Sequence, residues 1–249
     1  MCCFSKKVQS VSATKIFARD SRGDRQYLVY EMQLRAKEQL AMILPIPVPE
    51  NSQEKAVTFI NLKGYTRFFV DLSLGFPKGR GAAGGMGFGG HGGAAKKTLE
   101  VVEVGDFEAS FVPKVADFER LDERFRLPAE TWNELPAYKN YGFAVFKLKP
   151  GGTRHPMAFE FPRAKPEELF FPTVHIHDGM VHAEAGYDHK LYCQTGEGDY
   201  EALTHWTESE SPARRFMDIR RTKGIVDGDE HCYVRDIRGR HKNEDVVLA

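Results

Sequence analysis

Three histidines lie within eight residues of one another in the segment TVHIHDGMVH, which runs from residue 173 to residue 182. They are His175, His177 and His182. The imidazole ring is a common metal ligand, and its nitrogens bind zinc at about 2.0–2.1 Å. This spacing therefore leads to the hypothesis of a soluble metal-binding protein, and the residue types suit a transition metal ion, Zn or Cu.

The Asp-Gly pair at residues 178–179 gives these histidines a predicted geometry. Such a pair between alternating residues is typical of a two-residue β-hairpin turn, because glycine accepts the positive φ that the turn requires. In this hairpin His175 lies opposite His182, and His177 lies two residues along the same face. If the site is that of a metal-dependent enzyme, Glu184 on the same face is the candidate base.

Two questions about the histidines stay open. On the exposed face of a strand, histidine is an ordinary polar residue, and the three rings then bind nothing. If a metal is bound, a further ligand has to come from elsewhere in the chain. The candidates for that ligand are His155, His189 and Cys193.

The beginning of the chain carries a second reactive group, the thiol of Cys2. If Met1 is removed, Cys2 has a free amine beside its thiol, and one residue supplies both nucleophile and base. Together with Arg19 and Asp20 in IFARD, this start resembles the choloylglycine-hydrolase and penicillin-acylase group of enzymes. The resemblance implies an N-terminal-cysteine amidohydrolase in which Cys2 is the nucleophile, Arg19 lowers its pKa and Asp20 orients the amine. The alternative is that Cys2 is a small residue packed in a first strand.

Three proline- or aromatic-rich segments resemble an uncharacterised bacterial domain family. They are LAMILPIPVP at residues 40–49, VGDFEASFVP at 104–113 and YGFAVFKLKPG at 141–151, in a chain with an early cysteine. The resemblance implies a shared architecture and a bacterial source, and it assigns no role to any residue.

The elements that must position these groups are mostly short strands joined by turns. Alternating or β-branched runs predict strands at residues 12–19, 25–34, 56–62, 98–104, 107–113, 142–148 and 155–163, among others. The Gly-Asp pair at residues 105–106 predicts a hairpin turn between two of them. Apolar residues at helical spacing predict one helix over residues 65–76. This pattern predicts an α+β fold of mostly antiparallel sheet with a few short helices.

The glycine tract and the proline-rich run decide the expected domain organisation. Residues 79–93 hold nine glycines, so we expect a long Gly-rich surface loop at residues 79–95. One α+β domain over residues 1–249 is expected, and the alternative is two subdomains at 1–77 and 97–249. The prolines in residues 40–49 predict an edge strand or an extended segment.

Composition and charge limit the classes of partner. Basic and acidic residues balance at 35 each, so no net field attracts nucleic acid or an anionic membrane. No apolar run typical of a signal peptide is seen, and we expect a cytoplasmic protein. A third hypothesis is a non-catalytic binding or assembly module, in which the apolar run offers an edge strand to a protein partner or to a second copy in a homo-oligomer.

Overall fold

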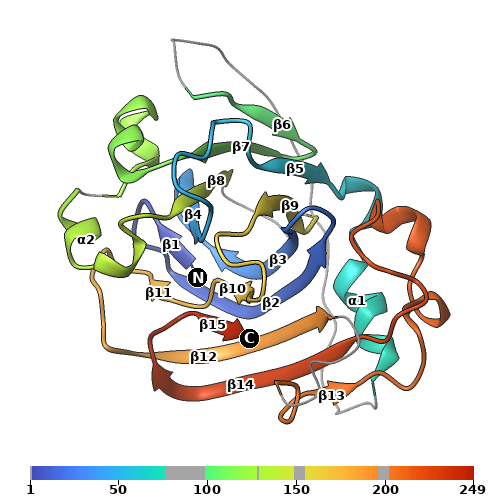
Figure 1. The fold of residues 1–249 in the computed structure, drawn as a ribbon. Coiled ribbons are helices and arrows are strands. Elements are labelled where there is room, and N and C mark those ends of the chain that lie inside the picture. Colours follow the sequence, from blue (N-terminus) through green and yellow to red (C-terminus); the bar gives the residue numbers. More distant parts are fainter. Residues whose placement is uncertain (1, 77–98, 128, 149–154, 196–201) are drawn as a thin grey trace.

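The protein consists mainly of β-strands, which form two large sheets (Figure 1). The computed structural model describes residues 2–76, 99–127, 129–148, 155–195 and 202–249. The first sheet has the order β11 (His175–Ile176), β1 (Cys2–Phe4), β4 (Leu40–Ile46), β8 (Gly142–Leu148), β7 (Phe107–Val112), β6 (Val102–Val104). The second sheet has the order β13 (Thr207–Glu208), β14 (Tyr233–Lys242), β12 (Glu184–Gln194), β2 (Ser10–Ser21), β3 (Arg25–Arg35), β9 (Met157–Pro162), β5 (Thr58–Asn61). A separate pair joins β10 (Leu169–Phe171) to β15 (Val246–Leu248).

Both large sheets are mixed, so the prediction of a mostly antiparallel sheet is only partly right. β1 pairs with β11 in parallel, and β2 pairs with β12 in parallel, whereas the other described pairs are antiparallel. Local sequence patterns reveal hairpins well, but a parallel pair joins strands that a long connection separates. The coarser prediction, many strands with a few short helices, is confirmed.

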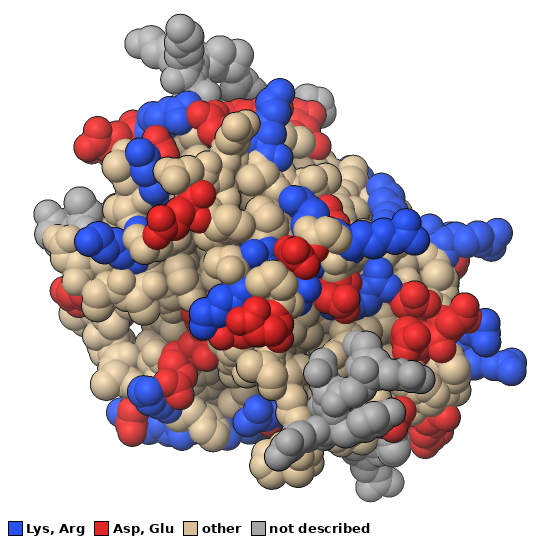
Figure 2. Space-filling model, in the orientation of Figure 1, with Lys and Arg blue, Asp and Glu red and all other residues tan. Residues whose placement is uncertain are grey.

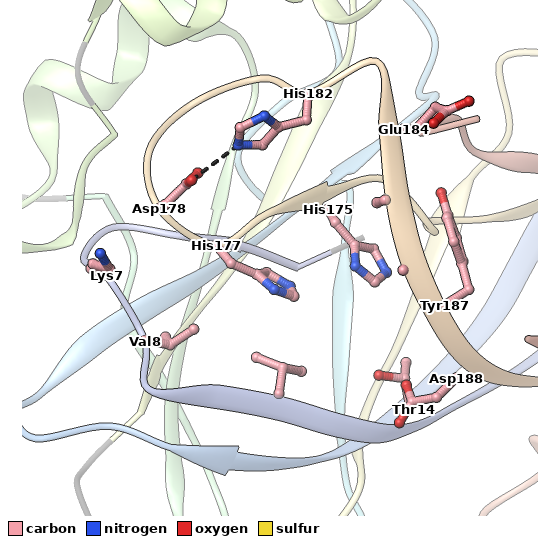
Figure 3. Close-up of a pocket in the computed structure, with 13 residues that line it drawn as sticks. Lys7, Val8, Thr14, His175, His177, Asp178, His182, Glu184, Tyr187 and Asp188 are labelled. Atoms are coloured by element: carbon pink, nitrogen blue, oxygen red, sulfur yellow. Dashed lines mark hydrogen bonds and ion pairs between the residues drawn. The ribbon is translucent and has the colours of Figure 1, made fainter. Parts of the chain in front are cut away.

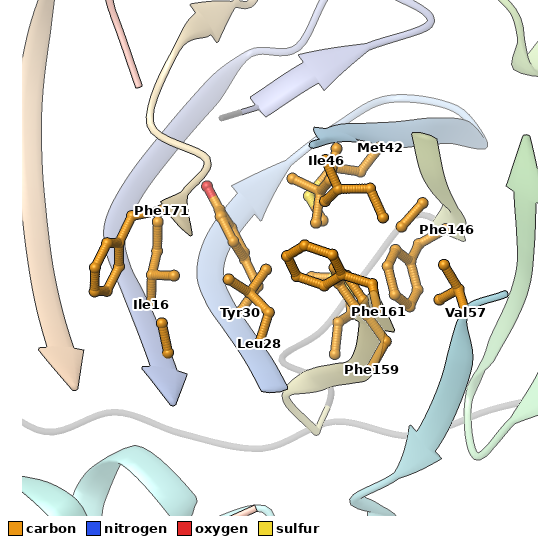
Figure 4. Close-up of a cluster of buried hydrophobic side chains, with 14 of the residues drawn as sticks. Ile16, Leu28, Tyr30, Met42, Ile46, Val57, Phe146, Phe159, Phe161 and Phe171 are labelled. Atoms are coloured by element: carbon orange, nitrogen blue, oxygen red, sulfur yellow. The ribbon is translucent and has the colours of Figure 1, made fainter. Parts of the chain in front are cut away.

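The central core lies between the two sheets. In β4, Leu40, Met42 and Leu44 belong to this core, whereas Ala41 and Ile43 face the other side of the sheet. This alternation explains why the segment reads as one continuous apolar run, because both faces of the strand are buried. Figure 4 shows core side chains from both sheets, among them Ile16, Leu28, Tyr30, Met42, Ile46, Phe146, Phe159 and Phe161.

Short helices cover the outer faces of the sheets. Residues 115–138, which include α2 (Ala129–Asn133), supply aromatic side chains to a cluster on the first sheet. On the second sheet the cover comes from α1 (Phe68–Leu72) and from residues 213–226. The helix predicted over residues 65–76 is therefore confirmed in its centre, where α1 is flanked by 3-10 turns.

The apolar run at residues 40–49 contains an interior strand, not the edge strand that its prolines predict. β4 lies between β1 and β8, and every residue of it is buried. The proline at position 45 is tolerated because β1 pairs only with Met42 and Ile43, which leaves the later part of β4 without that neighbour. β4 is paired on both sides at Met42 and Ile43, so the run is not a free edge strand, and the binding-module hypothesis itself stays a prediction.

Several other predictions have a plain outcome. The Gly-Asp turn at residues 105–106 joins β6 to β7 as predicted, with a φ of 66° at the glycine. The glycine-rich tract at residues 79–95 lies outside the described residues, and both large sheets combine strands that precede it with strands that follow it. In the described ranges, no helix is both long and apolar enough to cross a membrane. Figure 2 shows basic and acidic side chains interspersed over the visible face.

Candidate functional site

The strand that carries His175 pairs with the first strand of the chain, and no hairpin forms around residues 178–179. β11 lies parallel to β1, with His175 opposite Cys2. β12 pairs instead with β14 and with β2. The predicted cross-strand pair of His175 and His182 is therefore wrong.

The side chain of Asn243 explains why the two arms of this loop do not pair. Its Oδ1 accepts a hydrogen bond from the backbone N–H of His175 at 2.7 Å. Its Nδ2 donates to the carbonyl oxygens of His175 and His182, both at 2.9 Å. These bonds satisfy backbone groups that a hairpin would have used. Residues 178–179 still form a turn, with a φ of 86° at the glycine.

Two of the three predicted ligands lie together, and His189 takes the place of the third. The rings of His175 and His177 stack with 4.8 Å between their centroids. The Nε2 of His175 lies 3.1 Å from the Nε2 of His189, which comes from β12. His182 points away from them toward Asp178, at 3.0 Å, and its side chain is 53% exposed (Figure 3). We refer to His175, His177 and His189 as the imidazole cluster.

Burial keeps the imidazole cluster uncharged. It lowers the pKa of His175 to about 3 and that of His189 to about 2, and it also lowers the pKa of His177. All three rings are therefore neutral at pH 7, which is the form of histidine that binds metals. Among the described residues, no hydrogen-bond partner is found for the buried Nε2 of His177 or the buried Nδ1 of His189.

A pocket of about 530 Å³ lies beside His175 and His177. An irregularity of β2 lies at its wall, where the register against β3 shifts at residues 12–15 and Ala13 has a φ of 51°. The N–H of Ala13 donates to the carboxylate of Asp188 at 2.5 Å. β-Bulges are frequent next to functional sites because they redirect side chains. Other polar residues that line the pocket are Lys7, Thr14, Asp178, His182, Glu184 and Tyr187 (Figure 3).

The other candidate residues do not join the imidazole cluster. Glu184 lines the pocket, but its carboxylate accepts a hydrogen bond from Arg240 at 2.7 Å, and its side chain is largely exposed. His155 is a satisfied core residue: its Nε2 accepts from the N–H of Asp106 at 3.0 Å, and its Nδ1 contacts the next carbonyl oxygen at 2.9 Å. Cys193 belongs to the central core.

The backbone of Cys2 lies next to the imidazole cluster, but Arg19 is engaged elsewhere. Arg19 lies five residues along β2 from Thr14, which lines the pocket, a separation of about 16 Å along a strand. Its Nη2 donates to the carbonyl oxygen of Gly224 at 2.9 Å, and its guanidinium lies over the ring of Tyr27. Asp20 follows it on the same strand. The roles that the hydrolase resemblance implies for Arg19 and Asp20 have no counterpart in these contacts.

Two residues that position the site, Asn243 and Asp245, were not predicted from the sequence. The half-buried Asp245 accepts hydrogen bonds from the backbone N–H groups of Thr173 and Val174, at 2.7 and 3.0 Å. It also accepts from the hydroxyl of Tyr138 at 2.7 Å, and burial raises its pKa. No local pattern marks either residue, because their partners lie about 70 or more residues earlier in the chain. His189 did carry a signal, since it occupies a buried position in an alternating strand.

The donor atoms of the imidazole cluster determine whether the site can bind a metal ion. As the side chains stand, the described residues contain no group of three His, Cys, Asp or Glu arranged to hold a metal ion. The Nε2 pair of His175 and His189 supplies two donor atoms at one place, with His177 beside them.

Comparison with known proteins identifies the fold. No family model matches the chain, and no curated protein matches it. The crystal structure of baculovirus P35 aligns with a TM-score of 0.50 and 15% identity, over 96% of both chains. The structure of a mutated baculovirus P35 after caspase cleavage aligns with a TM-score of 0.50 and 14% identity, over 95% of this chain and 99% of that chain. At this identity the match shows a shared fold along almost the whole length.

Proposed function

We propose that this protein is a protein-binding module whose partner is a cysteine protease of the caspase class. The observation that carries the proposal is the fold shared with baculovirus P35 over 96% of both chains. One of the matching structures is of a P35 after caspase cleavage, so a protein with this fold is cut by such a protease. One fold hosts many functions, so a shared fold alone does not assign one. Two features support the proposal here: the match covers almost the whole chain, and the strands are arranged as a cleaved protein would need.

The strand arrangement suits a protein that is cut and yet stays in one piece. A protease needs backbone that is not held in a sheet, and the described strands are paired with neighbours. We therefore expect the cut bond to lie in a connection between strands. Each large sheet contains strands from before and after the connection between β5 and β6. A cut there leaves two fragments that share both sheets and the central core, so they remain associated.

The test uses the full-length protein without a tag and an active protease of the caspase class. We expect an equimolar mixture to form a one-to-one complex on gel filtration and to lose peptidase activity. Intact mass should show a single cut outside the described strands, with both fragments co-eluting under native conditions. The proposal is overturned if a panel of such proteases forms no complex, keeps full activity and leaves the chain uncut.

Two controls define what the result means. A protease whose catalytic cysteine is replaced by serine separates binding from cleavage, and we expect it still to bind. A cysteine protease of an unrelated fold tests the class, and we expect it neither to bind nor to be inhibited. Gel filtration of the protein alone measures whether it forms a homo-oligomer.

We place this activity in the cytoplasm, and Cys232, a buried free thiol, suits a reducing compartment.

A second candidate function is the N-terminal-cysteine amidohydrolase. The observation that favours it is the register of β1, which puts Cys2 opposite His175 and beside a cluster of neutral imidazoles. Its test begins with intact mass, because Met1 must be absent for the Cys2 amine to act as base. Hydrolysis of linear amides that Cys2→Ser abolishes would support this function, and a retained Met1 in active protein would exclude it.

A further inference from the structure

The imidazole cluster is a chemical feature that protease binding does not use. The ring of His175, in β11, contacts both the ring of His177, the residue after that strand, and the ring of His189, in β12. His189 is buried and the other two residues are half-buried. Two buried ring nitrogens, one on His177 and one on His189, have no hydrogen-bond partner among the residues that the structure describes. A buried polar atom without a partner is costly, and apolar side chains of similar shape would avoid that cost. Of these two atoms, the proposal concerns the Nε2 of His177, whose ring lies beside that of His175, and a ligand bound there would remove its cost.

The distance between two of the rings suits a metal ion. The Nε2 atoms of His175 and His189 are 3.1 Å apart and share a hydrogen bond, which a bound ion would replace. An ion placed about 2.0–2.1 Å from each, as zinc is from histidine, would subtend an angle of roughly 100° between them. That angle lies between the ideal values for neighbouring ligands in square-planar and tetrahedral sites. Two nitrogens are thus already spaced as neighbouring ligands of one ion.

We propose that the imidazole cluster binds one transition metal ion of the class that prefers imidazole, such as Zn²⁺, Co²⁺ or Cu²⁺. His175 and His189 bind through Nε2, and the unpartnered Nε2 of His177 becomes the third ligand when its ring turns toward them. Water from the pocket takes the remaining position. His182, the third ligand predicted from the sequence, is not part of this site because its ring pairs with Asp178.

The surroundings provide an entry path and a favourable charge. Figure 3 shows the rings of His175 and His177 facing the pocket, so an ion reaches them from solvent. The carboxylates of Asp178, Asp188 and Glu184 line this pocket together with the cation Lys7, and Arg240 pairs with Glu184. A cavity lined with an excess of one sign of charge raises the local concentration of the opposite ion. The site is also independent of protease binding, so either proposal can fail without the other.

The experiment titrates the full-length, tag-free protein with Zn²⁺ by calorimetry and with Co²⁺ by visible absorption. We expect one ion per chain, with Co²⁺ bands typical of nitrogen ligands. At Zn²⁺ concentrations of about 100 times the dissociation constant, the unfolding midpoint should rise by about 5–10 °C. His177→Ala should weaken Zn²⁺ binding by more than about 100-fold, which exceeds the loss expected from a merely supporting residue.

The matched control is His182→Ala, which removes an exposed histidine from the rim of the same pocket. We expect this variant to bind Zn²⁺ as the wild type does. The proposal is wrong if the folded wild type takes up neither ion, if His177→Ala keeps full affinity, or if His182→Ala is the variant that loses it.

A measurement on the unmodified protein removes any dependence on variants that fold poorly. Long-range ¹H–¹⁵N spectra report the ring nitrogens of all nine histidines. We expect Zn²⁺ to shift the Nε2 signals of His175, His177 and His189 and to leave those of the other histidines in place. Shifts confined to other histidines would overturn the proposal.

Discussion

At the scale of single residues, the imidazole cluster makes stability depend on pH. The pKa of His175 is about 3 and that of His189 about 2 in the folded protein, whereas unfolded histidine titrates near 6.5. Above pH 6.5 the rings are neutral in both the folded and the unfolded protein, so protonation of these rings does not reduce the free energy of unfolding there. As the pH falls below 6.5 the unfolded chain binds protons that the folded protein refuses, so the fold loses stability down to about pH 3.

We therefore predict that the free energy of unfolding falls by on the order of 1 kcal/mol per pH unit for each of these two histidines as the pH is lowered from about 7 to about 5. Urea unfolding at several pH values measures this slope. His189→Gln should reduce this slope, because it removes one of the groups. His205→Ala, at an exposed histidine, should have the slope of the wild type. Equal slopes in all three proteins would show that the buried rings are not the cause.

Asn243 is the residue that holds the loop of the imidazole cluster. We predict that Asn243→Ala lowers the free energy of unfolding by about 1–3 kcal/mol, since it removes three hydrogen bonds to the backbone of His175 and His182. Asn140→Ala is the matched control, because this exposed side chain makes one bond, at 3.2 Å, to Glu50. Urea unfolding should show a change below about 0.5 kcal/mol for the control. A similar small change in both variants would contradict the assigned role.

At the scale of elements, close packing between strands can be tested at two glycines. A Cβ on Gly142, in β8, would lie 2.5 Å from the ring of Phe111 and 3.0 Å from Val48. A Cβ on Gly186, in β12, would have no heavy atom within 4 Å. We predict that Gly142→Ala costs about 1–3 kcal/mol by overpacking, whereas Gly186→Ala changes stability by less than about 0.5 kcal/mol. Thermal unfolding of the two variants checks this, and a tolerated Gly142→Ala would mean that the sheet relaxes there.

Elements were predictable from the sequence where the signal was local. The hairpin of β6 and β7 followed from a Gly-Asp pair between alternating residues, and α1 followed from aromatic spacing. The interior position of β4 was not predictable, because it depends on pairing with β1 at the start of the chain. The proline in β4 is compatible with that position only because β1 is three residues long. The hairpin predicted at residues 178–179 failed for a related reason. The Asp-Gly pair does mark a change of direction. However, β1 and the side chain of Asn243 pair with the backbone of β11, which the hairpin would have needed.

The candidate site was predictable to the same extent. His175 and His177 could be found because they are close in sequence and share one face of a strand. His189 joins them only because the fold brings β12 next to His175. Spacing along the sequence cannot report that contact, and it favoured His182 on the basis of a turn that does not form a hairpin.

At the scale of the whole molecule, the two sheets share one core and should unfold together. The chain has two tryptophans, which report on different layers. Trp132 stacks on Phe118 at 5.1 Å on the outer face of the first sheet, and Trp206 packs on Phe171 at 5.6 Å beside the central core. We predict that, within each of the variants Trp132→Phe and Trp206→Phe, the fluorescence of the remaining tryptophan and the far-UV circular dichroism give coincident urea transitions. Separate midpoints for the two probes within one variant would mean that the layers unfold as independent units.

The parallel pairing of β2 with β12 also limits how early the second sheet can form during translation. Ala13 bonds to a side chain 175 residues later, and β2 finds its second neighbour only when that part of the chain has been made. At about 5–20 residues per second, the ribosome needs about 9–35 s to cover this interval. Until β9 has been made, both edges of the nascent β2–β3 ribbon are open, and the β2 edge stays open until β12 follows. Such edges readily pair with other chains. The newly made protein therefore depends most on chaperones before its last quarter emerges.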